Sequence, residues 1–334
     1  MEIRARNVNG MLEDALWWLK TAGVKENSRN GPVIVSPEPV LLDYEKSTER
    51  VLFSETRDAN PWLHLFESIY FLHGGRNLDW ITQFNSRFHE FSDDGKILHG
   101  AYGYRWRKWF KFDQLATIAK HLKNQPNSRR AVLTMWSPRG DLIPNRKGEG
   151  GLSSKDTPCN VVVFFDRRDN RLNMTVCNRS NDCLFGALGA NSVQFSILQE
   201  YLASWIGVRV GIYRQFSHNF HVYTKLKGYP SCDPVEIGCE DRYEEGVVHP
   251  VPLIQDTVAA FDTDLKLFMS DPLSDVDYHD PFFNEVAAPM YASWHERKTK
   301  VNTGLSAAQS IKASDWRRAC VEWIQRRERK AKNV

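Results

Sequence analysis

Residues 157–206 read TPCNVVVFFDRRDNRLNMTVCNRSNDCLFGALGANSVQFSILQEYLASWI, the part of the chain with the clearest structural pattern. Segments 160–165 and 172–177 are rich in Val, Phe and Thr and predict paired strands, and the charged segment 166–170 between them predicts a turn. Segment 192–206 is mostly apolar and predicts a helix. We therefore expect a strand pair and a buried helix at the centre of the core.

The rest of the chain predicts a mixture of helices and strands. A glycine at position 23 favours an end to the first helix there. Residues 137–157 are polar and rich in Gly, Lys and Ser, which predicts a loop. By apolar periodicity, helices are expected over 8–20, 62–72, 112–122, 256–269 and 307–327, and strands over 33–44, 50–53 and 130–136.

Composition indicates an ordinary globular protein. The chain has 334 residues, of which 42% are hydrophobic and 25% charged, and its net charge is only +3, which gives no support for a protein that coats nucleic acid. The basic run RRERKAKNV at 326–334 is expected to be a solvated helix end. Six cysteines without a CxxC pair predict reduced thiols, no metal site and a cytoplasmic location, and the N-terminus has no apolar stretch typical of a membrane span.

Cys159 is the candidate nucleophile. It stands where the polar loop enters a predicted strand, and Arg179 and Ser180 directly follow the partner strand. In a hairpin the arginine would lie close to the thiol, and a nearby cation lowers the pKa of a thiol and increases the thiolate fraction that attacks carbon.

Arginines beside serines and glycines indicate a phosphate site. Arg29 lies in NSRNG, Arg129 and Arg130 in NSRR, and Arg179 in NRSND. A guanidinium matches phosphate oxygens with two parallel donors, so this group suits a phosphate monoester. The chain has no glycine-rich motif of the kind that binds nucleoside triphosphates or dinucleotides.

Several motifs together resemble a known family. NSRRAVLTMW (127–136), TPCN (157–160), NRSNDCLFG (178–186), Asn191 and HNFHVY (218–223) occur in this order. They resemble thymidylate synthase and its sister enzymes, the pyrimidine nucleotide hydroxymethylases of phages, over roughly residues 28–223. The resemblance implies an α+β fold with a large bent mixed sheet packed on a buried helix. It also predicts a catalytic domain over 1–230, and we expect 231–334 to form an extension with added helices.

The resemblance also implies a role for individual residues. The substrate would be a pyrimidine nucleoside monophosphate, the one-carbon donor 5,10-methylenetetrahydrofolate, and the protein a homodimer that exchanges arginines across its interface. No nucleic acid or membrane partner is expected. By motif position, the implied roles are nucleophile for Cys159; proton transfer for Glu67 and Tyr102; phosphate binding for Arg29, Arg179 and Ser180, and across the dimer for Arg129 and Arg130; base recognition for Asn191; sugar binding for His221 and Tyr223; folate binding, with a part in catalysis, for Asp182; and folate binding for Gly186.

Four departures from the family bear on the product. Phe88 and Phe91 in FHEFSDDG, which we expect to line the folate site, stand where synthases carry tryptophans, and the apolar closing tail of synthases is absent; both favour water as the final reactant. Asn160 replaces a histidine, and the turn GALGAN before Asn191 is one residue longer. The last two departures leave the choice between uracil and cytosine open. Asn191 is an amide where the cytosine enzymes of the family tend to carry a carboxylate, so it favours uracil and hence a deoxyuridylate 5-hydroxymethyltransferase. A dCMP or CMP hydroxymethyltransferase, a thymidylate synthase and a non-catalytic nucleotide- or RNA-binding relative stay open as alternatives.

Overall fold

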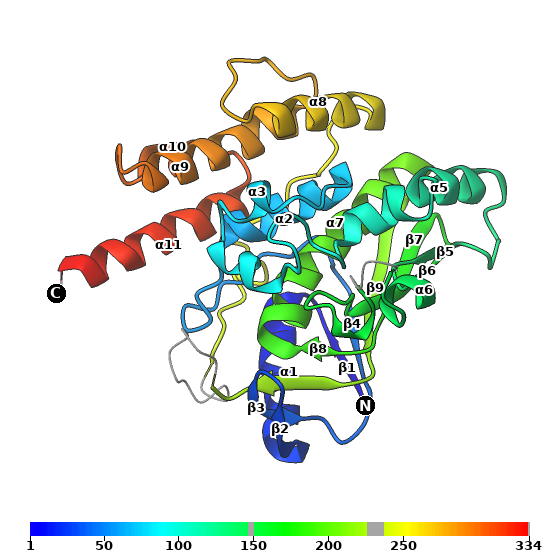
Figure 1. Cartoon of the computed structure of the whole chain (residues 1–334). Helices are drawn as coiled ribbons and strands as arrows, with labels where there is room; N and C mark the ends of the chain where they lie inside the picture. Colours follow the sequence, from blue (N-terminus) through cyan, green and yellow to red (C-terminus); the bar gives the residue numbers. More distant parts are fainter. Residues whose placement is uncertain (146–149, 226–236, 333–334) are drawn as a thin grey trace.

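A mixed six-stranded sheet forms the centre of the computed structural model, which describes residues 1–145, 150–225 and 237–332 (Figure 1). The strand order is β1-β4-β9-β7-β6-β5; β1 is parallel to β4 and β7 to β9, and the other neighbours are antiparallel. The strands span β1 (Glu2–Ala5), β4 (Val40–Tyr44), β9 (Arg209–Ser217), β7 (Arg171–Asn178), β6 (Asn160–Arg168) and β5 (Val132–Thr134).

The predicted strand pair is the β6–β7 hairpin. Its strands are longer than expected, and the turn is only Asp169 and Asn170, whose φ values are 50° and 56°. Two positive φ values suit a two-residue hairpin turn, and Asn and Asp tolerate them. The register shifts between Asn160 and Val162, so β6 is irregular directly after Cys159.

A small second sheet lies beside the first. The predicted strand 33–44 is in fact two strands, one in each sheet, because Pro37 and Pro39 cannot donate to a strand ladder. The parallel pairing of β10 with β8 sets His221 opposite Asp182. The strands of this sheet are β2 (Val24–Ser28), β3 (Gly31–Val35), β10 (Phe220–Tyr223) and β8 (Asn181–Asp182).

The strand predicted at 50–53 is wrong. Its backbone groups pair with side chains instead of a neighbouring strand: Val51 N donates to Tyr243 Oη at 3.2 Å, and Phe53 N donates to Asn9 Oδ1 at 2.9 Å. Asn9 Nδ2 in turn donates to Val51 O at 3.1 Å. These partners satisfy the buried polar backbone of the segment without a ladder.

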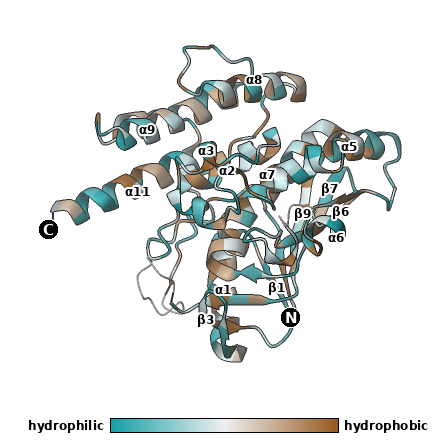
Figure 2. Cartoon of the chain, viewed as in Figure 1, coloured by the Kyte–Doolittle hydropathy of each residue, from teal (hydrophilic) through white to brown (hydrophobic). Residues whose placement is uncertain are grey.

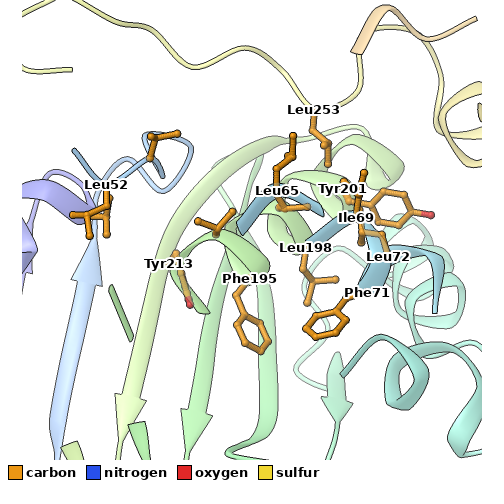
Figure 3. Packing of buried hydrophobic residues seen from close by; sticks show 14 of the residues in the cluster. Leu52, Leu65, Ile69, Phe71, Leu72, Phe195, Leu198, Tyr201, Tyr213 and Leu253 are labelled. Carbon is orange, nitrogen blue, oxygen red and sulfur yellow. The ribbon is translucent and has the colours of Figure 1, made fainter. Parts of the chain in front are cut away.

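Two central helices pack against each other and the sheet. The predicted buried helix is confirmed as α7 (Asn191–Ile206), which is buried on nearly all sides, and the helix predicted at 62–72 is confirmed as α2 (Pro61–His73). Figure 3 shows Phe195 and Leu198 of α7 close to Phe71 and its neighbours on α2. Because α2 and α7 both border the functional pocket described below, their packing fixes part of its wall.

The first predicted helix is confirmed as α1 (Val8–Ala22). Asn7 caps its start by accepting a hydrogen bond from Asn9 N, and Gly23 follows its last residue. Leu12 and Leu16 are buried on one side, whereas Glu13 and Asp14 are exposed, and Figure 2 shows hydrophobic and hydrophilic stretches on this helix. The helix therefore covers the core with one face.

The C-terminal helices share the core of the preceding residues. Trp62 of α2 donates from Nε1 to Met290 O at 2.9 Å, and its ring centroid lies 5.4 Å from that of Trp294 and 5.1 Å from that of Trp323. The predicted domain boundary at 230/231 falls outside the described residues. The helices are α8 (Val258–Ser270), α9 (Ala288–Lys298), α10 (Leu305–Ser310) and α11 (Ser314–Lys332).

The remaining elements correct several expectations. The single helix expected at 307–327 is two helices, α10 and α11, and α9 is not predicted at all. The start of the basic run is not solvated, because Arg326 and Arg327 both bind the Asp58 carboxylate. The 137–157 loop contains two short helical segments. These two segments are α6 (Pro138–Asp141) and the 3-10 segment Gly151–Ser153. The other helices are α3 (Leu78–Ile81), α4 (Tyr102–Tyr104) and α5 (Gln114–Asn124). The chain also contains the 3-10 segment Ser86–Phe91 and the π-helical segments Arg105–Trp109, Cys183–Ala190 and Phe283–Ala287.

None of the helices in the described ranges combines the length and the apolar character that crossing a membrane requires.

Candidate active site

Cys159 and Arg179 lie side by side at the open end of the β6–β7 hairpin. The strand register pairs Asn160 with Asn178, so the next residues outward face each other, and Arg179 N donates to Cys159 O at 3.0 Å. The Arg179 guanidinium donates from Nη2 to Cys159 Sγ at 3.7 Å and is held by two backbone carbonyl oxygens of the preceding loop. The hairpin therefore sets a cation beside the thiol, as its sequence predicts.

Burial dominates the electrostatics of this thiol. Burial raises the pKa of Cys159, the charges of Arg179 and Arg29 lower it, and the charge of Asp156 raises it; the net direction is upward. The expectation of a net lowered thiol pKa is therefore wrong for the free protein. Arg179 instead offsets part of the desolvation that the thiolate suffers in this position.

A pocket with a volume of about 340 Å³ opens beside the thiol. Its walls come from α2, the 88–102 region, the loop before β6, the β8–α7 segment and β10, so segments far apart in the sequence meet here. Most residues singled out by sequence line it: Glu67, Phe88, Phe91, Tyr102, Cys159, Ser180, Asp182, Gly186, Asn191, His221 and Tyr223.

The other predicted arginines lie outside this lining. Arg29 is exposed in the turn between β2 and β3, yet its charge acts on Cys159, and the next residue, Asn30, donates from Nδ2 to Tyr223 Oη at 3.4 Å. Its turn thus borders the pocket. Arg129 and Arg130 are exposed just before β5 and do not line the pocket of their own chain.

Glu67 is buried in α2 and lines the pocket with 5% of its surface exposed. Burial raises its pKa to about 7, while a side-chain hydrogen bond with Gln194 lowers it and the charge of Asp156 raises it. A carboxyl group in this state exchanges protons near neutral pH, which suits a proton-transfer role. Tyr102 is half-buried, and its pKa is raised, first by burial and then by the charge of Cys159.

A relay of amides fixes the orientation of Asn191. Gln215 Nε2 donates to Ala187 O at 2.9 Å, so Gln215 Oε1 is left to accept from Asn181 Nδ2 at 3.1 Å. Asn181 Oδ1 then accepts from Asn191 Nδ2 at 3.0 Å, and Asn160 Nδ2 donates to Asn191 Oδ1 at 3.4 Å. The Ala187 backbone carbonyl at the start of the relay can only accept, so each side-chain amide in the relay has one allowed orientation. Asn191 therefore cannot flip without breaking this relay.

His221 and Tyr223 project from β10 into the same pocket. Their rings lie edge to face with centroids 5.2 Å apart, and His221 Nδ1 lies 2.8 Å from Asn219 Oδ1. The structure thus brings the two residues together as their motif predicts. Two polar groups side by side on a strand can bind a pair of neighbouring hydroxyl or phosphate oxygens.

The pocket lining also combines aromatic rings with a carboxylate. Phe88 and Phe91 lie edge to face, with centroids 6.2 Å apart. Asp182 Oδ1 accepts from Phe185 N, and burial raises the pKa of this carboxyl group. Gly186 is required for space, because a Cβ there would lie 2.6 Å from Asn181 Oδ1. A flat ring with N–H donors fits these groups.

Comparison with known proteins decides the family. The family model described as thymidylate synthase matches residues 14–231.

The chain belongs to the thymidylate synthase family.

Members of this family transfer a one-carbon unit from a folate to a nucleotide, so the chain is a one-carbon transferase enzyme. It is similar to the deoxyuridylate hydroxymethyltransferase of Pseudomonas phage M6, with 43% identity over 97% of this chain and 94% of the relative. The deoxyuridylate hydroxymethyltransferase of Bacillus phage SP01 is 34% identical over 58% of this chain and 51% of the relative. The thymidylate synthase of Vesicomyosocius okutanii is 26% identical over 63% and 78%. The similarity to the M6 protein therefore continues through most of the residues beyond the family model.

The pocket of this thymidylate synthase family member also contains residues that sequence reasoning missed. Asp156, Asn181, Phe185 and Gln194 all line it. Gln194 follows Asn191 by three positions on a helix and so shares its face, and Asp156 precedes the nucleophile by three residues in a loop. The three-residue spacings of Gln194 from Asn191 and of Asp156 from Cys159 were the features of the sequence that could have identified these two residues.

Proposed function

We propose that the protein is a deoxyuridylate 5-hydroxymethyltransferase, which transfers a one-carbon unit from 5,10-methylenetetrahydrofolate to carbon 5 of dUMP. The observation that carries the proposal is the Cys159–Arg179 pair at a pocket that also contains three carboxyl groups of raised pKa, Glu67, Asp156 and Asp182. The names of the M6 and SP01 relatives support the same substrate and product.

Covalent addition explains why a thiol is needed. Carbon 5 of a pyrimidine is a weak nucleophile until the Cys159 sulfur adds to carbon 6 and turns the ring into an enolate. Glu67, with a pKa of about 7, and Tyr102 then transfer protons to and from the pyrimidine ring. Once the donor has left, carbon 5 bears an exocyclic methylene group, which water converts to hydroxymethyl.

The remaining residues hold the nucleotide. Arg29, Arg179 and Ser180 bind the 5′-phosphate. Asn191 reads the base edge in the single orientation that its relay allows, and the sugar hydroxyl binds His221 and Tyr223. Arg179 therefore has two tasks, because the guanidinium that contacts the sulfur also receives the phosphate.

Folate fits the aromatic part of the pocket. The donor supplies the one-carbon unit and, when bound, a flat pterin ring with N–H donors. In the described part of the chain, Asp182 Oδ2 and Gln194 Oε1 are buried without a hydrogen-bond partner, and both residues line the pocket. Phe88, Phe91, Asp182 and Gly186 would hold the donor. Phenylalanine in place of indole gives a smaller shield against water, which supports hydroxymethyl as the product.

The uncovered face of the large sheet supports a homodimer. α7 packs on one face, whereas on the other face Val132, Phe164 and Phe216 are 41%, 47% and 37% exposed. Val132 pairs with Phe164 across neighbouring strands, and Phe216 lies on the same face in the adjacent cross-strand row, with Val162 and Cys177. In such a dimer, the exposed Arg129 and Arg130 at the sheet edge would complete the phosphate site of the partner.

Residues 231–334 are proposed to be an extension of the catalytic domain that supports α2. A cytoplasmic location stays a prediction from the cysteine pattern.

Product analysis tests the function. The protein is incubated with 5,10-methylenetetrahydrofolate and either dUMP, dCMP or CMP, and nucleotide products are identified by mass spectrometry while dihydrofolate is followed by absorbance. 5-Hydroxymethyl-dUMP without dihydrofolate is the expected result. Thymidylate with equimolar dihydrofolate would establish a thymidylate synthase, the second candidate that the family model favours, and a cytosine product would move the substrate to dCMP or CMP. Absence of any product would leave the non-catalytic alternative.

A further inference from the structure

Asp156 is a pocket carboxylate that the roles above leave unassigned. It is half-buried, lies three residues before Cys159 and lines the same pocket. Its Oδ2 accepts a hydrogen bond from Gly100 N at 2.7 Å. The carboxylate is therefore anchored by one oxygen inside the proposed catalytic pocket.

The surrounding loop holds Asp156 in this position from two sides. A Cβ at Gly100 would lie 2.8 Å from Asp156 O and 3.1 Å from Asp156 Oδ1, so only glycine leaves room for this arrangement. On the other side, Asp156 N donates to Ser154 Oγ at 3.2 Å, and Ser154 Oγ donates to Asp93 Oδ2 at 2.7 Å. Such preorganisation is what a catalytic group needs.

Asp156 also interacts electrostatically with the other reactive groups. Its negative charge raises the pKa of Glu67, Tyr102 and Cys159, which places all four within one electrostatic neighbourhood. Of the acidic side chains in the described pocket lining, only Asp156 belongs to the loop that leads to Cys159, because Glu67 lies on α2 and Asp182 on β8.

Asp156 and its neighbour Glu67 both have a raised pKa. Burial raises the pKa of Asp156 to about 6, with the Gly100 hydrogen bond and the charges of His99 and Arg105 lowering it and that of Asp93 raising it. Burial also raises the pKa of Glu67, to about 7. Both carboxyl groups can therefore take up and release a proton near neutral pH, as acid–base catalysis requires.

We propose that Asp156 is the catalytic base that accepts a proton from the water molecule adding to the exocyclic methylene group. The inference rests on the proposed function and names the group that selects its product. The water oxygen bonds to the methylene carbon, the π electrons move through carbons 5 and 4 to oxygen 4, and the water proton passes to Asp156. Collapse of the enolate restores the C5–C6 double bond and expels the Cys159 thiolate, so no oxidant or reductant is consumed.

The test compares Asp156→Asn with the unchanged protein in single turnovers of dUMP tritiated at carbon 5. Asparagine keeps the acceptor for Gly100 N but cannot take the proton. Tritium release, which precedes water addition, should stay within a few-fold of the unchanged protein, whereas 5-hydroxymethyl-dUMP formation should fall on the order of 10²–10³-fold. Added 2-mercaptoethanol should capture the stalled methylene group as a thioether that mass spectrometry detects. Asp79→Asn, which removes an exposed charge, is the matched control.

Three results would overturn the assignment. Normal hydroxymethylation by Asp156→Asn would show that no base is needed there, and an equal loss of tritium release and product would show an earlier or purely structural role. Formation of a covalent complex with 5-fluoro-dUMP, which has no carbon-5 proton to lose, distinguishes an earlier catalytic role of Asp156 from a structural one. Failure of Asp156→Asn to form this complex would show that the pocket is disrupted and would reject a role confined to the water-addition step. If the unchanged protein forms no 5-hydroxymethyl-dUMP, the proposed function falls first.

Discussion

Arg179 Nη2 and Cys159 Sγ are 3.7 Å apart across the end of a hairpin whose turn holds only two residues. The same guanidinium is pinned by backbone carbonyl oxygens, so it stays beside the sulfur without a bound ligand. Burial nevertheless keeps the thiol pKa above its ordinary value. The Cys159 thiol is therefore harder to ionise than an ordinary thiol, although the fixed Arg179 guanidinium reduces the free-energy cost of forming the thiolate.

Replacing Arg179 should raise the thiol pKa further. In Arg179→Gln the desolvated thiolate loses its largest stabilising charge, so alkylation by iodoacetamide at pH 8 should slow about tenfold for each unit that the pKa rises. Arg29→Gln should have a smaller effect, and Arg168→Gln, whose exposed partner is Asp166, should have none. A larger effect at Arg29 than at Arg179 would contradict the electrostatic picture.

Glu67 should make the protein less stable at alkaline pH. Its carboxyl group ionises near 4.5 when unfolded and near 7 when folded, so this group's contribution is complete below pH 4.5 and is lost as the pH rises to 7. Glu67→Gln should therefore unfold at higher urea concentration than the unchanged protein at pH 8, by on the order of 3 kcal/mol, and lose this advantage near pH 4.5. The exposed Glu26→Gln serves as control. An advantage independent of pH would reject the protonated buried carboxyl group.

Freeing Asn191 should weaken base discrimination. Asn181→Ala removes the acceptor that orients the Asn191 amide, so that amide could turn to match cytosine as well as uracil. The ratio of kcat/KM for dUMP over dCMP should fall about 10- to 100-fold, as expected for a misplaced buried hydrogen bond. Ser217→Ala removes another Asn181 contact but leaves its Oδ1 in place, and should keep the ratio. An unchanged ratio in Asn181→Ala would show that the relay does not control selectivity.

Subunit mixing tests the shared arginines. Arg130→Ala and Cys159→Ala should each be poorly active alone, because the first loses a phosphate ligand and the second its nucleophile. In a mixed dimer one site regains both groups, so random reassembly should restore about a quarter of full activity. Rescue is measured after co-refolding against each variant alone. Its absence would indicate that each chain builds its own site.

Asp58 should anchor α11. It binds Arg326 and Arg327, and although burial raises its pKa, the two arginines more than offset this and lower it overall. Its contribution should thus be present above the unfolded carboxyl pKa and disappear as the pH falls through the lower folded one. Asp58→Asn should lower the free energy of unfolding by about 1 kcal/mol at pH 7. Asp58→Ala should cost more, because φ at this position is 47°, which asparagine tolerates better than alanine.

Much of the fold is predictable where the pattern is local. The β6–β7 pair, α1, α2 and α7 follow from periodicity and turn residues in the chain itself. The strand predicted at 50–53 is wrong because the backbone N–H groups of Val51 and Phe53 donate to the side chains of Tyr243 and Asn9 instead of to another strand, which no local pattern reveals. α9 fails because its pattern is interrupted by polar residues and becomes helical through packing on Trp62.

The site divides in the same way. Hairpin logic predicts the contact between Cys159 and Arg179, and the family motifs single out most of the pocket lining. The direction of the thiol pKa could not be predicted, since burial depends on the whole fold. Asp156 was missed because its proximity to Gly100 is set by the path of a loop rather than by an element.

The cluster of Trp62, Trp294 and Trp323 gives the C-terminal helices a role in positioning α2. α2 carries Glu67 into the pocket, while its first turn is clamped through Trp62 to Met290 and to the rings of Trp294 and Trp323. A chain without these helices would lose the contacts that fix the first turn of α2. The position of Glu67, and with it proton transfer, should then be disturbed before the position of the Cys159 thiol.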